Sequence, residues 1–141
     1  MKQTVLLCAL FFAQILLGQS EIDQVKLTLQ NYIDGSSYNR KEQLKNAFTI
    51  DATLYLTTKN GFKRYSPNEY ADFFKGKKEG EFNGRQGEVL AVDIINDIAT
   101  AKVEIAGPDR KLVYIDLFLL KKKGEKWSII SKTATRVDEN K

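Results

Sequence analysis

The chain has no histidine and only one cysteine, Cys8, among its 141 residues. Histidine is the commonest general base and metal ligand at neutral pH, so its absence excludes histidine-dependent catalysis and histidine-containing metal sites. Cys8 lies in an N-terminal apolar run that we expect to be removed, which also excludes thiol nucleophiles, disulfides and Cys/His zinc sites. Any chemistry must come from Asp, Glu, Tyr, Lys or hydroxyl groups, and we expect neither a metal nor a cofactor.

Neither sign of charge dominates, with 22 Lys and Arg against 18 Asp and Glu and a formal net charge of +4. The densest basic runs are Lys121-Lys122-Lys123 and Lys75 with Lys77-Lys78, each beside a glycine. Neither run is interleaved with aromatic residues, so both are typical of solvated turns rather than of a nucleic-acid surface. We therefore expect no nucleic-acid partner.

Residues 1–20 have the pattern of a secretory signal peptide. Lys2 supplies a positive start, residues 5–17 are apolar apart from Gln14, and Gly18 and Ser20 are small residues before a cut after Ser20. The apolar run is about 13 residues, shorter than the roughly 18–20 that span a bilayer. We expect an exported protein, periplasmic or secreted, whose mature chain is one domain over residues 21–141 with no membrane span.

Three helices are predicted in the first half of the mature chain. Apolar residues at helical spacing indicate a helix over residues 21–34, ended by Gly35-Ser36-Ser37, and a second over residues 41–48. Ser66-Pro67-Asn68-Glu69 is a capping box with proline at the first helical position, which predicts a third helix leading towards Gly76. Residues 76–87 are rich in glycine and charge, and form either a simple connection or a lid.

Strands dominate the rest of the chain. A strand over residues 51–58 precedes the hairpin turn Asn60-Gly61, and four further strands are predicted over residues 88–95, 98–106, 111–121 and 126–136. Short turns between consecutive strands predict an antiparallel meander. The fold class is therefore α+β, with three N-terminal helices packed on a curved antiparallel sheet.

Pairing the strands about their turns assigns one sheet face, on which Asp116 is the only charged residue. We expect Asp116 opposite Ala101 and Ser131, among apolar neighbours. Burial of a carboxyl group favours its protonated form, so Asp116 could donate a hydrogen bond to a ligand. The alternative is a structural aspartate satisfied by Ser131 or by the backbone. The assigned face comprises Leu90, Val92, Ile94, Ala99, Ala101, Val103, Ile105, Leu112, Tyr114, Asp116, Phe118, Leu120, Trp127, Ile129, Ser131 and Thr133.

The opposite face of the 111–121 strand is also apolar, through Val113, Ile115, Leu117 and Leu119. A strand that is apolar on both faces needs cover on both sides, and three helices can cover only one. We therefore expect a homodimer that packs sheet against sheet.

The order of elements resembles the nuclear transport factor 2-like fold, the cone shared with ketosteroid isomerases, over essentially all of residues 21–137. Short stretches make it similar to the putative lumazine-binding branch of bacterial members. They are Tyr32-Ile33-Asp34-Gly35, Leu44-Lys45-Asn46-Ala47-Phe48, Asp51-Ala52-Thr53-Leu54, Ile98-Ala99-Thr100-Ala101-Lys102-Val103, Tyr114-Ile115-Asp116 and Trp127-Ser128-Ile129-Ile130-Ser131-Lys132-Thr133.

The resemblance to the isomerases implies an oxyanion hole formed by Tyr32 and Asp116. The position of the family's catalytic base is occupied by Leu56, and without a base an oxyanion hole cannot move a proton. The candidate replacement bases are Asp34, Asp51, Tyr55, Lys102 and Glu104, and none is compelling. The sequence therefore favours a binding domain over an enzyme.

The leading hypothesis is a domain that binds a small, partly apolar ligand, with Tyr32 and Asp116 holding an acceptor on it. The expected apolar walls are Phe48, Tyr70, Phe73, Phe74, Tyr114, Phe118 and Trp127. One alternative is an isomerase or dehydratase that uses Tyr32 and Asp116 as an oxyanion hole. The second is a structural dimerisation module whose interior is filled by its own side chains.

Overall fold

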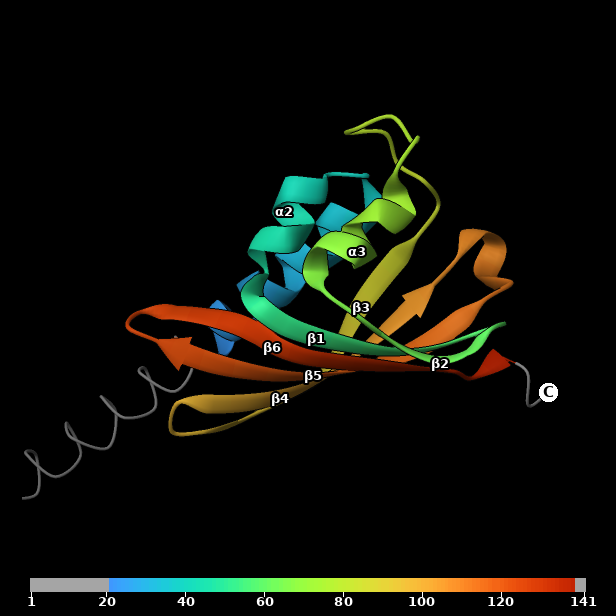
Figure 1. Cartoon of the computed structure of the whole chain (residues 1–141). Coiled ribbons are helices and arrows are strands. Elements are labelled where there is room, and N and C mark those ends of the chain that lie inside the picture. Colours follow the sequence, from blue (N-terminus) through green and yellow to red (C-terminus); the bar gives the residue numbers. More distant parts are fainter. Residues whose placement is uncertain (1–20, 139–141) are drawn as a thin grey trace, which may run out of the picture.

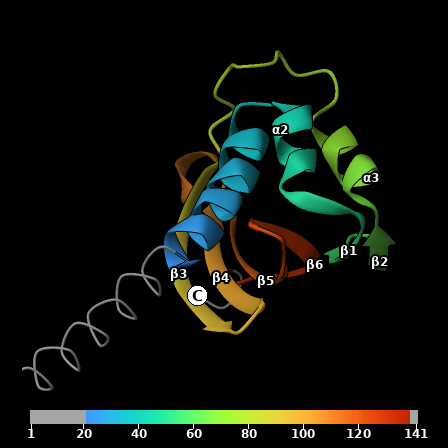
Figure 2. The same ribbon diagram turned by 90° about the vertical axis from the view of Figure 1, so that its left-hand side faces the viewer.

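The helices lie together on the concave face of one curved sheet. The structure is a computed structural model and describes residues 21–138. In Figure 1 the helices lie above the sheet and the other face of the sheet is open below them. Figure 2 shows the sheet curling around the helices. This is the α+β arrangement that the sequence predicts, with the functional candidates in the space between helices and sheet.

The first helix extends over residues 21–37, three residues beyond the predicted end at 34. Gly35 lies inside this helix and does not end it. Its lack of a side chain lets a neighbouring segment approach the helix closely. A Cβ atom at Gly35 would lie 2.5 Å from the backbone nitrogen of Leu44. The missing side chain therefore lets the helix that contains Leu44 pack directly against the first one.

The other two helices are shorter than predicted. Helix α2 covers Lys41–Asn46, and Phe48 already begins the first strand. Helix α3 covers Pro67–Ala71 and continues as the 3-10 helix η1, Asp72–Phe74. The predicted capping box is present, since the Ser66 side chain accepts from the backbone of Glu69 and the Glu69 side chain accepts from the backbone of Ser66.

The sheet has six strands in the order β2-β1-β6-β5-β4-β3. The prediction of a purely antiparallel sheet is wrong, because β1 pairs with β6 in parallel. The predicted meander of the last four strands is confirmed, and so is the hairpin at Asn60-Gly61. The strands are β1 Phe48–Thr58, β2 Gly61–Tyr65, β3 Gln86–Ile95, β4 Ile98–Ala106, β5 Val113–Lys123 and β6 Lys126–Arg136. A 3-10 turn, η2 Pro108–Arg110, joins β4 to β5.

The strand registers differ from the predicted ones by two residues between β4 and β5 and by a bulge between β5 and β6. Ala101 lies opposite Val92 as predicted, but Asp116 lies opposite Val103 rather than Ala101. A shift of two residues leaves the same side chains on the same face. Between β5 and β6, however, Leu119 pairs with Ser131 and Leu120 with Ile129, so Ile130 is an extra residue in β6. This bulge reverses the facing of every later residue in β6.

Because of the bulges, several residues face the opposite side of the sheet from the one predicted. Lys132 is buried where Ser131 and Thr133 were expected to point inward. A second bulge, between Val89 and Ala91, turns Val89 towards the core and leaves Leu90 exposed. Leu112 precedes β5 and is exposed as well.

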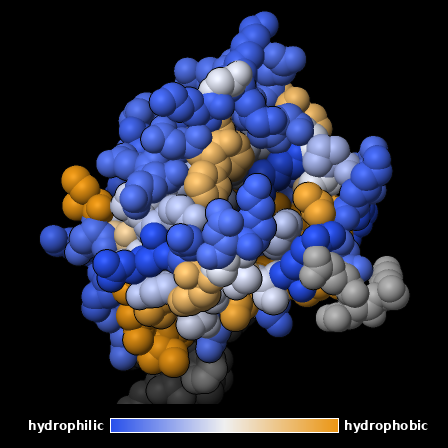
Figure 3. Space-filling model, turned by 45° about the vertical axis from the view of Figure 1, so that its right-hand side comes forward, coloured by the Kyte–Doolittle hydropathy of each residue, from blue (hydrophilic) through white to orange (hydrophobic). Residues whose placement is uncertain are grey.

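Apolar side chains remain on the outer face of the sheet. Leu117 and Leu119 of β5 are 48% and 38% exposed, and Ile98 of β4 is exposed beside them. In Figure 3 hydrophilic side chains cover most of the visible face, and apolar ones gather at the lower edge, on the sheet side of the molecule. Among the helices within residues 21–138, none is long and apolar enough to cross a membrane.

Candidate functional site

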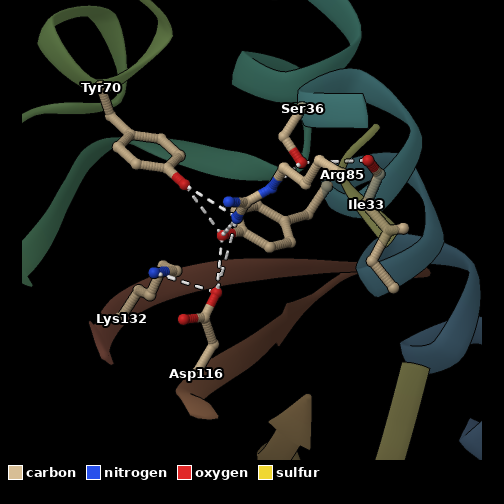
Figure 4. Close-up of polar contacts among 7 residues, drawn as sticks. Ile33, Ser36, Tyr70, Arg85, Asp116 and Lys132 are labelled. Carbon is tan, nitrogen blue, oxygen red and sulfur yellow. Dashed lines mark hydrogen bonds and ion pairs between the residues drawn. The ribbon is translucent and has the colours of Figure 1, made fainter. Parts of the chain in front are cut away.

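Tyr32 and Asp116, the pair that the sequence selects, meet in the interior of the fold. The Tyr32 hydroxyl on the first helix donates to Oδ2 of Asp116 on β5 over 2.7 Å. Both side chains are buried, and Figure 4 shows Asp116 rising from the sheet towards the tyrosines. The prediction that these two residues lie together is confirmed by this geometry.

Asp116 is not the only charged residue on its face. The Lys132 ammonium lies 3.1 Å from the same Oδ2 atom, and both side chains are 2% exposed. Lys132 reaches this place because the bulge at Ile130 turns it inward. The predicted alternative partner Ser131 faces the other way. Asp116 therefore accepts from Tyr32 and Lys132, which is the role of an ionised carboxylate rather than that of a donor.

Three aromatic rings surround the Lys132 ammonium. Its nitrogen lies 5.4 Å from the ring centre of Tyr70, 5.6 Å from that of Tyr32 and 5.9 Å from that of Phe118. Ring faces attract a cation within about 6 Å, and more strongly where water is excluded. The rings and Asp116 together compensate Lys132 for the loss of its hydration.

Arg85 is a second cation that sequence reasoning missed. It lies just before β3 and its guanidinium caps the tyrosine pair (Figure 4). Nε donates to the Ser36 hydroxyl over 3.0 Å, while Nη2 donates to the hydroxyls of Tyr32 and Tyr70 over 3.0 and 3.3 Å. Its charged end is 4.0 Å from Oδ2 of Asp116. The buried cluster thus holds two cations and one carboxylate.

The direction of the hydrogen bonds follows from the donors available. A tyrosine hydroxyl has one proton, and that of Tyr32 goes to Asp116. In the 3.0 Å hydrogen bond between the hydroxyls of Tyr32 and Tyr70, Tyr70 must therefore be the donor and Tyr32 the acceptor. Burial, and next the nearby Asp116 carboxylate, raise the pKa of the Tyr32 hydroxyl well above its usual range. Tyr32 therefore stays protonated, and its proton is already committed inside the cluster.

Most of the predicted aromatic wall surrounds this cluster. Phe118 and Phe48 meet the ring of Tyr32 edge-on, with ring centres 5.0 and 5.9 Å apart. Phe73 and Phe74 meet the ring of Tyr70 in the same way. Tyr114 is half-buried against the same core.

Trp127 lies elsewhere. It pairs with Lys122 at the hairpin end of β5, whereas Asp116 pairs with Ala134 near the other end. The indole nitrogen of Trp127 donates to the Glu21 carboxylate over 2.7 Å.

The replacement bases are not aimed at the cluster. Leu56, at the position of the isomerase base, is buried in the core. Tyr55 directly precedes Leu56 on β1 and stacks on Phe62 of β2, with both rings exposed. Asp34 accepts from the Gln30 side chain at the helix surface. Within residues 21–138 there is no group of three His, Cys, Asp or Glu side chains suited to a metal ion.

The segment before β3 is fastened to the end of the first helix. The Asn39 side chain donates to the carbonyls of Lys78 and Glu81, over 3.0 and 2.8 Å. The Asn83 side chain donates to the carbonyl of Ser36 and to Oδ1 of Asn39. These bonds hold residues 78–83 against the end of the first helix, and so hold the position from which Arg85 enters the cluster.

A hollow of about 450 Å³ lies on the outer side of Arg85. It sits where the end of the first helix meets the start of β3 and the end of β4. The Arg85 side chain is 21% exposed, and within residues 21–138 its Nη1 has no hydrogen-bond partner. The lining residues are Gln30, Ile33, Asp34, Ser37, Tyr38, Phe82, Arg85, Gln86, Gly87, Glu88, Glu104, Ala106 and Arg110.

Two features of this hollow suit a flat polar ligand. The rings of Tyr38 and Phe82 lie 5.5 Å apart at its rim, and Phe82 is half exposed. The Ser37 hydroxyl is buried and has no hydrogen-bond partner among the residues described.

A second hollow, of about 400 Å³, is lined by Trp127 and shares no residue with the first. Asp116 lines neither of the two.

Solved structures with similar folds come from several bacteria. A nuclear transport factor 2-like protein of unknown function from Shewanella baltica matches with a TM-score of 0.73 and 18% identity, covering 84% of this chain and 94% of its own. One from Silicibacter pomeroyi, also of unknown function, has a TM-score of 0.75 and 15% identity, over 85% and 98% of the two chains. A ketosteroid isomerase-like protein from Erwinia carotovora atroseptica has a TM-score of 0.64 and 15% identity, over 84% and 97%. These likenesses establish the nuclear transport factor 2-like fold.

No curated protein matches this chain significantly. A family model does, and its match extends over residues 20–134, from the first helix almost to the end of β6. The family is described as "Putative lumazine-binding". It takes in every element that builds the Tyr32–Asp116 cluster and the hollow beside Arg85. The chain thus belongs to the putative lumazine-binding family.

Proposed function

We propose that this protein is a small-molecule-binding domain whose ligand is a flat, polar heterocycle of the lumazine class, bound in the hollow beside Arg85. The observation that carries the proposal is Arg85 in the lining of that hollow, with no hydrogen bond at Nη1 to any residue in the described part of the chain. Ligand sites in proteins commonly have volumes of roughly 300–1,000 Å³, with a few fixed polar groups among apolar ones. The hollow has this size, and its lining is mainly polar and charged, which suits a polar ring more than an apolar one.

The lining matches the edge of such a ring. A lumazine carries carbonyl oxygens and ring N–H groups alternately along one edge. The Nη1 donors of Arg85 would bind a carbonyl oxygen, and the acidic side chains of Asp34 and Glu88 would accept from ring N–H groups. Tyr38 and Phe82 offer aromatic surface for stacking. The buried cluster behind Arg85 would hold its guanidinium in place without touching the ligand.

This proposal differs from direct binding to Tyr32 and Asp116, because both of those groups are buried and paired with each other. Binding is also favoured over catalysis. Leu56 supplies no base, and the one proton that Tyr32 could donate already makes a hydrogen bond to Asp116. The isomerase or dehydratase alternative would need a carboxylate facing the Tyr32 hydroxyl from the ligand side, and neither Asp34 nor Tyr55 has that position.

Titration of lumazine into the purified full chain, followed by the fluorescence of the lumazine ring, tests the proposal. We expect saturable binding that weakens about tenfold in Arg85→Met, because a hydrogen bond to a charged group is lost. Phe82→Ala should also weaken binding, whereas Phe62→Ala, which removes an exposed ring on the far strand β2, should not. Equal affinity of all four proteins, or no saturable binding, would contradict the proposal.

We also propose that two copies of the chain pack through the outer face of the sheet. Leu117, Leu119 and Ile98 support this idea, because they form an exposed apolar group that the helices do not cover. Leu117→Lys with Leu119→Lys should convert the dimer to a monomer in sedimentation-velocity experiments. Leu27→Lys, at an exposed leucine on the first helix, is the matched control. A monomeric native chain would refute the dimer.

Export is the remaining part of the proposal. Glu21, the first residue after the predicted cleavage site, is bound to Trp127 and pairs with Lys122. These contacts would hold a new N-terminus at Glu21 against the domain. N-terminal sequencing of the protein recovered from the periplasm or medium of a bacterial host should begin at Glu21. Recovery of the intact chain from the cytoplasm alone would speak against export.

A further inference from the structure

We propose that the second hollow, beside Trp127, binds a small carboxylate that also carries an N–H group. It lies between the first helix, the end of α2 and the β5–β6 hairpin, and its volume is about 400 Å³. That volume lies towards the lower end of the range of ligand sites, roughly 300–1,000 Å³, and suits a small molecule. The proposal does not depend on lumazine binding, because the two hollows have no lining residue in common.

The charge at the mouth of this hollow indicates an anion. Lys123 and Lys126 lie directly opposite each other across the hairpin. Like charges in that position are destabilising. Their neighbours Lys121 and Lys122 pair with Asp97 and Glu21, but among residues 21–138 neither Lys123 nor Lys126 has an ion-pair partner.

Glu125 at the turn between them is the one acidic side chain of the lining, so the mouth carries an excess positive charge. A carboxylate placed between the two ammonium groups would relieve their repulsion.

The inner wall indicates a donor on the ligand. Oε1 of Gln24, on the first helix, is buried and has no hydrogen-bond partner in the part of the chain that is described. A buried acceptor left without a donor costs roughly 1–3 kcal/mol. Thr28, one turn further along, cannot help, because its hydroxyl donates to the carbonyl of Trp127 over 3.0 Å. An N–H group on the ligand would satisfy Gln24.

The floor between these polar groups is apolar. It includes Trp127, Ala47 and Leu27, and Leu27 is 63% exposed although it lies beside the hollow. Covering Leu27 with a short aliphatic group would remove apolar surface from water. Asn31 adds a donor at the edge, because its Oδ1 already accepts from Gln43 and its amide nitrogen is left to donate. An acylated amino acid has all three features: a carboxylate, an amide N–H and a short apolar side chain.

Trp127 makes the experiment specific, because it is the only tryptophan of the chain. Its intrinsic fluorescence reports on the second hollow and not on the first. We would titrate the full chain with N-acetyl-L-leucine and, in parallel, with N-acetyl-L-leucine amide, which lacks the carboxylate. Saturable change in Trp127 fluorescence with the acid, and at least about tenfold weaker binding of the amide, is the expected result. No saturable change with the acid, or equal affinities, would overturn the proposal.

Two variants locate the binding groups. Lys123→Gln with Lys126→Gln should weaken N-acetyl-L-leucine binding about tenfold, whereas Lys75→Gln with Lys77→Gln, an equal charge change on an exposed segment far from the hairpin, should not. Gln24→Met removes the unpaired acceptor at nearly constant volume. It should lower the affinity for N-acetyl-L-leucine but leave that for N-acetyl-N-methyl-L-leucine unchanged. If both lysine pairs act alike, the carboxylate is not held at the hairpin and the proposal fails.

Discussion

The Lys132 ammonium lies 3.1 Å from the Asp116 carboxylate, with both side chains withdrawn from water. Removing one partner of such a pair leaves a buried charge without compensation, which costs about 3–5 kcal/mol. Asp116→Asn should therefore lower the free energy of unfolding by about that amount in urea denaturation. Lys132→Met should cost less, because Asp116 keeps its bond to Tyr32 and Arg85 remains nearby.

The double variant Asp116→Asn with Lys132→Met separates the pair from its surroundings. Neutralising both partners removes the buried ammonium that Asp116→Asn leaves unpaired and keeps Arg85 as the one cation of the cluster, so we expect the double variant to be more stable than Asp116→Asn alone. If the two losses simply add, the carboxylate and the ammonium do not depend on each other, and the description of the cluster as an ion pair is wrong.

The raised pKa of Tyr32 predicts a loss of stability at high pH. Below the ordinary tyrosine pKa of about 10, folded and unfolded chains both hold this proton. Above it the unfolded chain releases the proton while the folded chain keeps it, so the free energy of unfolding must fall as the pH rises. Tyr32→Phe should show a shallower fall between about pH 10 and 11 in urea denaturation followed by circular dichroism. An unchanged slope would show that Tyr32 ionises normally.

Close approach at Gly35 predicts a large effect of a small change. In Gly35→Ala the new methyl group would overlap the backbone of Leu44, which cannot rotate away. We expect a loss of about 1–3 kcal/mol in thermal or urea unfolding, because overpacking forces the helices apart. Gly107→Ala is the control, since a Cβ there comes no nearer than 3.4 Å to another atom. Similar stability of the two variants would contradict the close packing of the helices.

The hydrogen bonds of the Asn39 side chain predict that the segment before β3 is held firmly in place. Its amide group donates to two backbone carbonyls, and its backbone has a positive φ of 57° that asparagine tolerates well. Asn39→Asp keeps the shape but replaces the donor by an acceptor, so both bonds are lost. Trypsin should then cut at Lys77 and Lys78 faster than in the native chain. Asn68→Asp, in helix α3, serves as the control, and equal cleavage rates in all three would refute the anchor.

Much of this fold could be predicted from local patterns. The capping box at Ser66, the turn at Asn60-Gly61 and the alternation along residues 98–106 each determine their own element. The inward facing of Asp116 also follows, because a two-residue error in register leaves the face unchanged, whereas its pairing with Tyr32 is what the resemblance to the isomerases implies.

What could not be predicted depends on contacts between distant segments. The parallel pairing of β1 with β6 has no signal in either strand. Lys132 was assigned to the wrong face because one extra residue, Ile130, reverses the strand, and the adjacent isoleucines at 129 and 130 are the only hint of it. Arg85 lies in a charged segment in which nothing distinguishes it from its neighbours.

The parallel pairing of β1 with β6 also sets the order in which the protein can fold. Strand β6 is central in the sheet and follows the other five described strands in sequence, so β1 and its hairpin partner β2 have no neighbour on their inner side until β6 is available. Pairing between segments so far apart in sequence makes folding slow. A chain ending before residue 126 should therefore remain protease-sensitive, because β1 and β2 cannot yet join the rest of the sheet.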